Sequence, residues 1–234
     1  MTEVFDLHGV QIPNDPAFIT NQIARAISKG RYEKQEVTTT PRFITAEDRV
    51  LELGAGLGFI STYVAKTLGV SQITCVEADP KLCGFIERVH AMNGIKGAQV
   101  RNCVATGQGE RGTMPFYVRD PFWSSSLDPE PDYVSMEDVP VVPLGELIAE
   151  SSANTLIVDI EGGERDLFQG ADLTGVNKIF LELHTRKIRR MGIKLCFDAL
   201  SAQDFCYDQQ VSNGGAVLFQ RIPQRQLRAY AAGG

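Results

Sequence analysis

The residues best suited to chemistry are acidic groups and one histidine that end two neighbouring apolar segments. Asp159 and Glu161 end one segment, and Glu182 and His184 end the next. Side chains alternate along a strand, so the two members of each pair share one side of their strand. Ligands of open α/β sheets bind beyond the carboxyl ends of the strands. We therefore expect these ionisable groups to converge at that edge.

A second chemical feature is the stretch ELGAGLG at 52–58, which closes an apolar strand and opens an amphipathic helix. Glycines permit positive φ and close approach of a ligand, and a helix that begins at Phe59 directs free N–H groups into the same crevice. A dinucleotide fingerprint would require Gly or Ala where Phe59 stands. The acidic-x-G-x-G-x-G spacing instead resembles motif I of class I S-adenosylmethionine-dependent methyltransferases.

The next strand supports a ligand at this loop. The apolar segment 72–76 ends in Glu77-Ala78-Asp79, about 20 residues after the glycines, where an acidic residue is expected to accept hydrogen bonds from ribose hydroxyls. A glycine-rich turn without any ligand would not require this second element. We therefore predict S-adenosylmethionine as the cofactor.

Longer stretches extend the resemblance to a family. Most of the chain, roughly residues 30 to 220, resembles the FkbM family of S-adenosylmethionine-dependent methyltransferases. The matching stretches are GRYE at 30–33, EADP at 77–80, NG at 93–94, VDIEGGE at 158–164, LFQGA at 167–171 and LELH at 181–184. Gly145 is a departure, because the family commonly has an aspartate there.

The resemblance implies a function and a set of cofactor contacts. Members of the family most often methylate a hydroxyl of a sugar, a polyketide or another small metabolite. The residues that we expect to bind the cofactor are Tyr32, Glu52, Gly54, Gly56, Gly58, Glu77, Ala78, Cys103 and Val104.

Methylation of an alcohol requires alignment of donor and acceptor, exclusion of water and removal of a proton. We predict His184 as the general base, Glu182 as the carboxylate that fixes its tautomer, and Asp159 as a ligand of the acceptor hydroxyl or of the methionine end of the cofactor. We expect His8 and His90 to be incidental.

Two further interpretations concern the same region. Glu164 is predicted to cap the short helix that runs through Leu167 and Phe168. Mg²⁺ is a second cofactor that the sequence allows, because an oxygen-rich set of ligands is available. That set comprises Asp159, Glu161, Glu182 and His184. We nevertheless do not expect the activity to depend on a metal.

The elements that must position these residues alternate along the chain, which predicts parallel pairing by right-handed crossovers. Strands are predicted at 49–51, 72–76, 99–104, 155–158 and 178–183, helices at 60–68, 82–92 and 191–200, and a final hairpin of strands at 205–207 and 216–219. With the resemblance, this order predicts an α/β class I methyltransferase (Rossmann-like) fold. Its seven-stranded sheet would be mostly parallel, with helices on both faces and an antiparallel C-terminal hairpin.

Three segments are expected. They are an N-terminal helical cap at 1–40, a cofactor-binding domain at 41–222 with an irregular insertion at about 106–138, and a C-terminal tail at 223–234. The cap helix is predicted to start at Asn14-Asp15-Pro16, to present Ile19, Ile23, Ala26 and Ile27 on one face, and to end at Gly30. The insertion should contain one strand, 114–118, and a candidate lid over the acceptor, FWSSSL at 122–127.

Composition narrows the partners. The 234 residues carry a net charge of −6, and this acidic balance argues against binding duplex nucleic acid. A small-molecule acceptor is expected. Five cysteines form no C-x-x-C pair, and no apolar run approaches the length that spans a membrane, so we expect a cytoplasmic protein without a membrane partner. Nothing in the sequence indicates an oligomeric state.

Two other classes of function remain open. A nicotinamide-dependent oxidoreductase would keep Glu77 as a ribose ligand but needs a different phosphate turn. A noncatalytic methyltransferase-like binding module would keep the glycines without a working acid–base pair, and the presence of both Glu182 and His184 counts against it.

Overall fold

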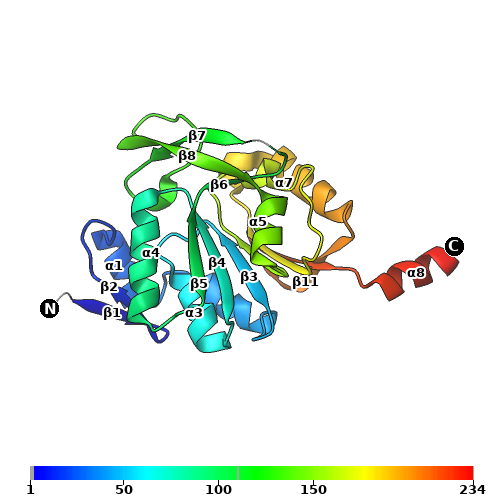
Figure 1. Cartoon of the computed structure of the whole chain (residues 1–234), viewed down its shortest axis with the longest axis horizontal. Helices are drawn as coiled ribbons and strands as arrows, with labels where there is room; N and C mark the ends of the chain where they lie inside the picture. Colours follow the sequence, from blue (N-terminus) through cyan, green and yellow to red (C-terminus); the bar gives the residue numbers. More distant parts are fainter. Residues whose placement is uncertain (1–2, 110, 234) are drawn as a thin grey trace.

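A computed structural model describes residues 3–109 and 111–233 of the chain (Figure 1). Within these residues the main sheet has seven strands in the order β11-β12-β10-β9-β3-β4-β5. They are β3 (Arg49–Leu53), β4 (Gln72–Glu77), β5 (Ala98–Asn102), β9 (Thr155–Val158), β10 (Lys178–Glu182), β11 (Phe205–Asn213) and β12 (Ala216–Arg221). Five neighbouring strands of this sheet, β10, β9, β3, β4 and β5, are parallel to one another. The hairpin of β12 and β11 is antiparallel and adds to the sheet beside β10. The predicted α/β fold is confirmed.

Helices cover both faces of this sheet, because residues on both sides of each central strand are apolar. In β9, Ile157 belongs to one hydrophobic core, and Leu156 and Val158 belong to the other. The helices are α1 (Asn21–Ser28), α2 (Lys34–Thr39), α3 (Phe59–Leu68), α4 (Pro80–Met92), α5 (Leu144–Ser151), α6 (Glu164–Leu167), α7 (Thr185–Ser201) and α8 (Gln224–Gly233), with 3₁₀ turns η1 (Thr40–Arg42) and η2 (Phe122–Ser124). Side chains of α1, α3 and α4 fill the first core, and those of α5, α6 and α7 fill the second.

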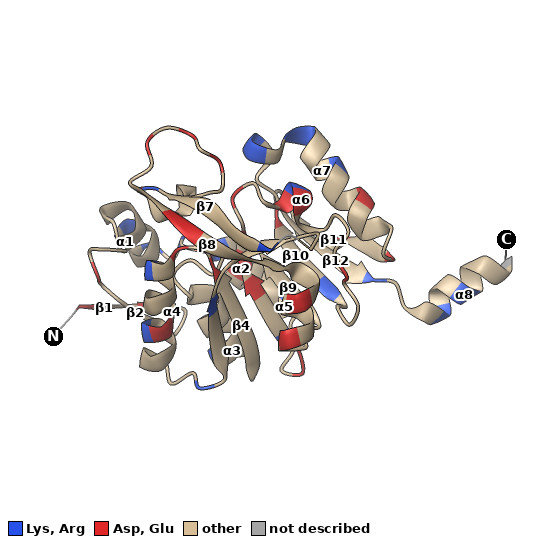
Figure 2. Cartoon of the chain, turned by 45° about the horizontal axis from the view of Figure 1, so that its top comes forward, with Lys and Arg blue, Asp and Glu red and all other residues tan. Residues whose placement is uncertain are grey.

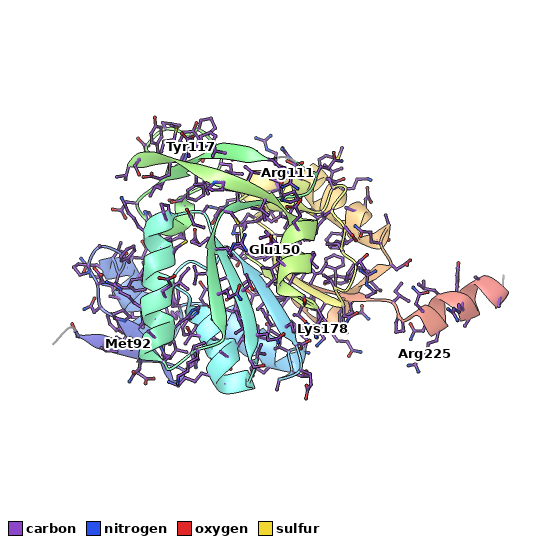
Figure 3. The ribbon with its side chains drawn as sticks, in the orientation of Figure 1. Met92, Arg111, Tyr117, Glu150, Lys178 and Arg225 are labelled. Atoms are coloured by element: carbon purple, nitrogen blue, oxygen red, sulfur yellow. The ribbon has the colours of Figure 1, made fainter. Side chains whose placement is uncertain are left out.

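The amino ends of three strands are tied together on the side of the sheet away from the predicted ligands. Asp48, just before β3, accepts hydrogen bonds from Lys178 Nζ at 2.7 Å and from Thr155 Oγ1 at 2.9 Å. Lys178 begins β10 and is labelled in Figure 3. This contact fixes β3, β9 and β10 relative to one another, so their carboxyl ends are held in place as well.

The N-terminal segment differs from the prediction. Residues before α1 form a hairpin of β1 (Val4–Leu7) and β2 (Val10–Pro13), and α1 starts only at Asn21. The predicted start is wrong because Asp15 accepts the N–H of Ala17 in a turn, whereas Thr20 is the cap that accepts the N–H of Ile23. The segment 1–40 is therefore only partly helical, and its residues 1 and 2 lie outside the described part of the chain.

The predicted insertion is more regular than expected. A second sheet joins β6 (Val104–Thr106), β8 (Ser135–Pro143) and β7 (Gly112–Val118), and it lies above the carboxyl edge of the main sheet in Figure 1. The strand at 114–118 is confirmed, but β8 was not predicted. Pro140 and Pro143 argue against a strand by sequence, since proline donates no hydrogen bond. The predicted strand 99–104 is divided into β5 and β6 at Cys103.

The predicted C-terminal tail contains α8, which extends away from the body of the molecule (Figure 1). Arg225 marks this helix in Figure 3. None of the helices in the ranges 3–109 and 111–233 combines the length and the apolar content that crossing a membrane requires.

Candidate functional site

A cavity of about 440 Å³ opens at the carboxyl edge of the main sheet. The ends of β3, β4, β9 and β10 form its floor, the segment from α1 to α2 forms one wall, and η2 covers it. A volume of this size lies within the range of small-molecule sites. The expectation that both chemical features meet at one edge is correct, since the glycine loop and the acidic strand ends line the same cavity.

The three glycines of the loop have different roles. A Cβ on Gly54 would lie 1.9 Å from the backbone oxygen of Asp159, and one on Gly58 would lie 2.8 Å from Ile86. These glycines let the loop pack against β9 and α4. Gly56 has φ of 53° and faces the cavity, where a Cβ would lie 3.5 Å from Phe122. Gly58 does not line the cavity, and its Cβ position faces Ile86 of α4.

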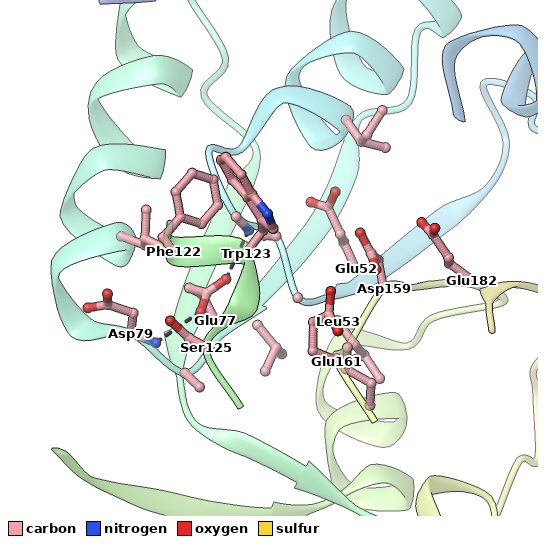
Figure 4. Close-up of a pocket in the computed structure, with 18 of the residues that line it drawn as sticks. Glu52, Leu53, Glu77, Asp79, Phe122, Trp123, Ser125, Asp159, Glu161 and Glu182 are labelled. Carbon is pink, nitrogen blue, oxygen red and sulfur yellow. Dashed lines mark hydrogen bonds between the residues drawn. The ribbon is translucent and has the colours of Figure 1, made fainter. Parts of the chain in front are cut away.

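Glu77 is held rigidly at the end of β4. Its Oε2 accepts the N–H of Gly56 and its Oε1 accepts the N–H of Asp79, both at 2.9 Å (Figure 4). Burial raises the pKa of Glu77 to about 7, although the two N–H groups favour the carboxylate. The side chain lines the cavity beside the glycine loop, as a ribose ligand should.

The other predicted cofactor contacts also line this cavity. Ala78, Cys103 and Val104 lie near Glu77, and Tyr32 lies against Phe59 at the start of α3. Glu52 is buried in β3, where Cys75 Sγ lies 3.4 Å from its Oε2. Burial raises the pKa of Glu52 to about 7.

His184 lies among carboxylates from α6 and from the segment that follows β9. Its Nδ1 donates a hydrogen bond to Glu164 Oε1, and its Nε2 lies 3.5 Å from Asp159 Oδ1 and 3.4 Å from Glu161 Oε1. The predicted cap role of Glu164 is wrong, because its side chain is buried against His184 and makes no cap hydrogen bond at α6. The predicted role of Glu182 in fixing the tautomer is also wrong, since Glu164 occupies Nδ1.

The carboxylates determine the charge of this histidine. Burial opposes protonation, but the hydrogen bond with Glu164 and the charges of Asp159 and Glu161 raise the pKa of His184 to about 9. The imidazole is therefore protonated near pH 7. Burial and the charge of Glu182 in turn raise the pKa of Asp159 well above its usual value.

The same group has the arrangement of a possible metal site. Asp159, Glu182 and His184 each offer one ligand atom, and these atoms lie within 4.8 Å of one another. Glu161, the fourth predicted ligand, is not part of this group. The fit to Mg²⁺ is partial, because Mg²⁺ prefers oxygen ligands and a proton at Nε2 would compete with any metal.

The predicted lid covers the cavity, but its hydroxyl groups have other partners. Phe122 and Trp123 line the cavity and pack edge to face against each other (Figure 4). Ser125 Oγ accepts the backbone N–H of Arg119, and Ser126 Oγ accepts a hydrogen bond from the Arg119 guanidinium. The lid therefore offers two aromatic faces, while these two hydroxyls hold its own loop together.

Two acidic residues of the cavity were not identified as site residues. Glu33 and Glu36 come from the start of α2, and Glu36 is only 8% exposed. Glu33 lies within the GRYE stretch that carries part of the resemblance, but Glu36 stands in a short polar helix that gives no sequence signal. The departure at Gly145 lies outside the cavity, where a Cβ would contact Asp172.

Comparison with known proteins bears on the fold. No protein-family model matches the chain, and no curated protein matches it. Solved structures do match. M. jannaschii TYW2 in complex with AdoMet is 11% identical over 94% of this chain and 87% of its own, with a TM-score of 0.51. The Pyrococcus horikoshii protein PH0793 is 11% identical over 94% of this chain and 70% of its own, also at 0.51.

The chain has a Rossmann-like α/β fold with a mostly parallel seven-stranded sheet, which it shares with these two structures. At 11% identity this likeness concerns the fold alone. The chemistry therefore has to be argued from the residues of the cavity.

Proposed function

We propose that this protein is an S-adenosylmethionine-dependent methyltransferase of the FkbM family that methylates a hydroxyl group of a small metabolite. The observation that carries the proposal is one cavity in which the Glu77 carboxylate and Gly56 face the same space as His184 and its carboxylates. A donor site and a proton-accepting site next to each other are what transfer to an alcohol requires.

The residues of one end of the cavity fit the cofactor. Both Glu77 oxygens are fixed by backbone N–H groups, and each keeps a lone pair for a ribose hydroxyl. Gly56 leaves room for close approach of the cofactor, and Ala78, Cys103 and Val104 supply an apolar surface for the adenine. Tyr32, Glu52 and Gly54 would surround the methionine end. When bound, S-adenosylmethionine supplies a methyl group on an electrophilic sulfonium.

The residues of the other end act on the acceptor. Glu164 holds Nδ1 of His184, so Nε2 faces the cavity. Once it has lost its own proton, Nε2 accepts the hydrogen of the acceptor hydroxyl, and the oxygen becomes the nucleophile. Asp159 and Glu182 hold the acceptor beside it. Phe122 and Trp123 exclude water from the cavity.

Mg²⁺ is a second candidate cofactor, although the ligand atoms of these residues fit it only partly. Asp159, Glu182 and His184 would be its ligands, and the ion would supply a positive charge that favours an alkoxide. A metal-dependent enzyme would lose its turnover in a chelator and regain it on addition of Mg²⁺, whereas we expect turnover to be unchanged.

The acidic net charge of −6 supports a small-molecule acceptor over duplex nucleic acid. The five cysteines are free thiols, as expected of a protein that works in a reducing compartment such as the cytoplasm.

Two measurements test the proposal. Calorimetry should detect binding of S-adenosylhomocysteine, and a fluorescence titration should detect no binding of NADH. Metabolite extracts incubated with the protein and a methyl-labelled donor should yield labelled products by mass spectrometry. Binding of NADH without binding of S-adenosylhomocysteine would instead indicate an oxidoreductase. Binding of S-adenosylhomocysteine without any labelled product would indicate a binding module.

A further inference from the structure

The end of the cavity near His184 is strongly acidic. Carboxyl side chains that line it include Glu33, Glu36, Asp159, Glu161 and Glu182, and Glu52 lies beside Asp159 (Figure 4). Figure 4 shows Asp159, Glu161 and Glu182 on the same side of the cavity, away from Glu77 and Asp79. Among the described lining residues, the cations that face these groups are the exposed Arg31 and the imidazole of His184. Like charges that lie close together repel one another unless a cation lies between them.

The basic residues of α7 act on this end only at its edge, where the charge of Lys187 lies near Glu161. They gather on the first turns of the helix, where Figure 2 shows them outside the body of the sheet, and none of them lines the cavity. Lys187 pairs with Glu130 at 2.9 Å, on the loop that precedes β8. The excess negative charge therefore faces the ligand.

Glu36 independently indicates the charge of that ligand. Its side chain is more than nine-tenths buried and lines the cavity. Within residues 3–109 and 111–233, its carboxylate takes part in no hydrogen bond and no ion pair, whereas the buried Asp48 has both. The carboxylate oxygens of Glu36 keep contact with the open cavity, so a ligand that displaces the cavity water leaves them without a partner unless that ligand brings a complementary charge or a hydrogen-bond donor.

We propose that the acceptor carries a protonated amino group, and that the carboxylates of Glu36 and Glu182 bind it beside His184. The inference rests on the proposed function and narrows its substrate class from metabolites in general to amine-bearing ones, such as amino sugars. The cofactor alone does not satisfy the site. Its sulfonium and amino group bring two positive charges and its carboxylate brings one negative charge, and we place its adenosine at the other end of the cavity, beside Glu77.

An ammonium group fits the cluster better than a metal ion does. The ligand atoms that come close enough for an ion belong to Asp159, Glu182 and His184, so an ion there would leave Glu36 without a partner. An amino group donates up to three hydrogen bonds in different directions, and so it can reach carboxylates from both α2 and β10.

The first test modifies the amines of the acceptor pool. One half of a metabolite extract is N-acetylated with an acetyl N-hydroxysuccinimide ester, and both halves are incubated with the protein and a methyl-labelled donor. We expect labelled products from the untreated half to be retained on a cation exchanger at pH 7, and the treated half to yield at least about tenfold less label. Equal labelling of both halves would overturn the inference and leave the methyltransferase proposal intact. No label from either half would overturn both.

The second test uses a matched pair of variants. Glu36→Gln removes the charge at nearly constant volume, and Glu87→Gln makes the same change on an exposed position of α4. Once the acceptor has been identified from its labelled product, Glu36→Gln should raise the KM for the acceptor about tenfold or more. The affinity of this variant for S-adenosylhomocysteine should be unchanged. Glu87→Gln should change neither quantity. An unchanged KM in Glu36→Gln would overturn the inference. So would wild-type turnover that a chelator abolishes and Mg²⁺ restores, because the cluster would then hold a metal.

Discussion

The two ends of the cavity differ in how far they are complete without a ligand. At one end, each oxygen of Glu77 accepts a backbone N–H at 2.9 Å, so the side chain has one orientation. At the other end, Glu36 and Glu182 accept no hydrogen bond from any described residue, and His184 lies among carboxylates that repel one another. The first end is preorganised for a common cofactor. At the second end Glu164 fixes His184, whereas Glu36 and Glu182 have no partner among the described residues, so this end should determine specificity.

The largest expected effect is on the acidic end. His184→Ala removes the proposed base, so turnover should fall by about 10²–10⁴-fold while S-adenosylhomocysteine binds with near wild-type affinity. Label transfer and calorimetry measure the two quantities. Glu164→Gln should cost more than Glu182→Gln, because Glu164 holds Nδ1. Loss of binding in His184→Ala would mean that the two ends are not separate.

Gly56→Val should block the cofactor end of the cavity, near Glu77. At φ of 53° a β-branched residue is strained, and its side chain would enter the cavity near Phe122 and Tyr32. Affinity for S-adenosylhomocysteine should fall at least about 100-fold by calorimetry. Gly94→Val is the matched control, since Gly94 has φ of 73° with nothing within 4 Å of its Cβ position. That variant should lose stability but keep its affinity.

The pH dependence of turnover sharpens the comparison. A base with a pKa of about 9 is neutral in only a small fraction of molecules at pH 7. Turnover at saturating substrates should therefore rise with pH, by up to about tenfold per pH unit, and level off near pH 9. The residual activity of His184→Ala should lack this rise. A flat wild-type profile between pH 7 and 9 would count against His184 as the base.

The same contrast explains what the sequence could predict. Motif residues such as Gly56 and Glu77 lie within one strand–loop–helix unit and the strand beside it, so spacing alone places them together. The strand β9 was predicted at its observed bounds because its apolar run ends at a polar residue. Patterns of this kind are local, and they depend little on the rest of the fold.

The acidic end depends on contacts between distant segments. Glu164 meets His184 across 20 residues, and its place after two glycines resembles an ordinary helix start. Glu36 joins the cavity only because α2 folds over the carboxyl edge of the sheet. The hairpin before α1 was missed for a similar reason, since its strands of four residues are stabilised by burying Ile12 in the first core.

Glu77→Ala should have a smaller effect than Gly56→Val. It removes hydrogen bonds to the ribose but leaves the space of the cavity open, so affinity for S-adenosylhomocysteine should fall about tenfold. The N–H groups of Gly56 and Asp79 would also lose their acceptor, and the melting temperature should fall slightly. Unchanged affinity by calorimetry would remove Glu77 from the cofactor site.

The smallest expected effect is the pH dependence of cofactor binding. Because the pKa of Glu77 is about 7, the carboxylate that accepts two ribose hydroxyls predominates only above that pH. Affinity for S-adenosylhomocysteine should thus fall about three- to tenfold between pH 8 and pH 6, as protonation removes an acceptor. Glu52 titrates in the same range, so the variant Glu77→Gln is needed to separate the two groups. If the affinity of Glu77→Gln for S-adenosylhomocysteine no longer depends on pH, the change belongs to Glu77. If the dependence on pH persists in this variant, the change belongs to Glu52. Calorimetry in Glu77→Gln and Glu52→Gln would then show whether the preorganised end titrates near pH 7, about two pH units below the histidine of the acidic end.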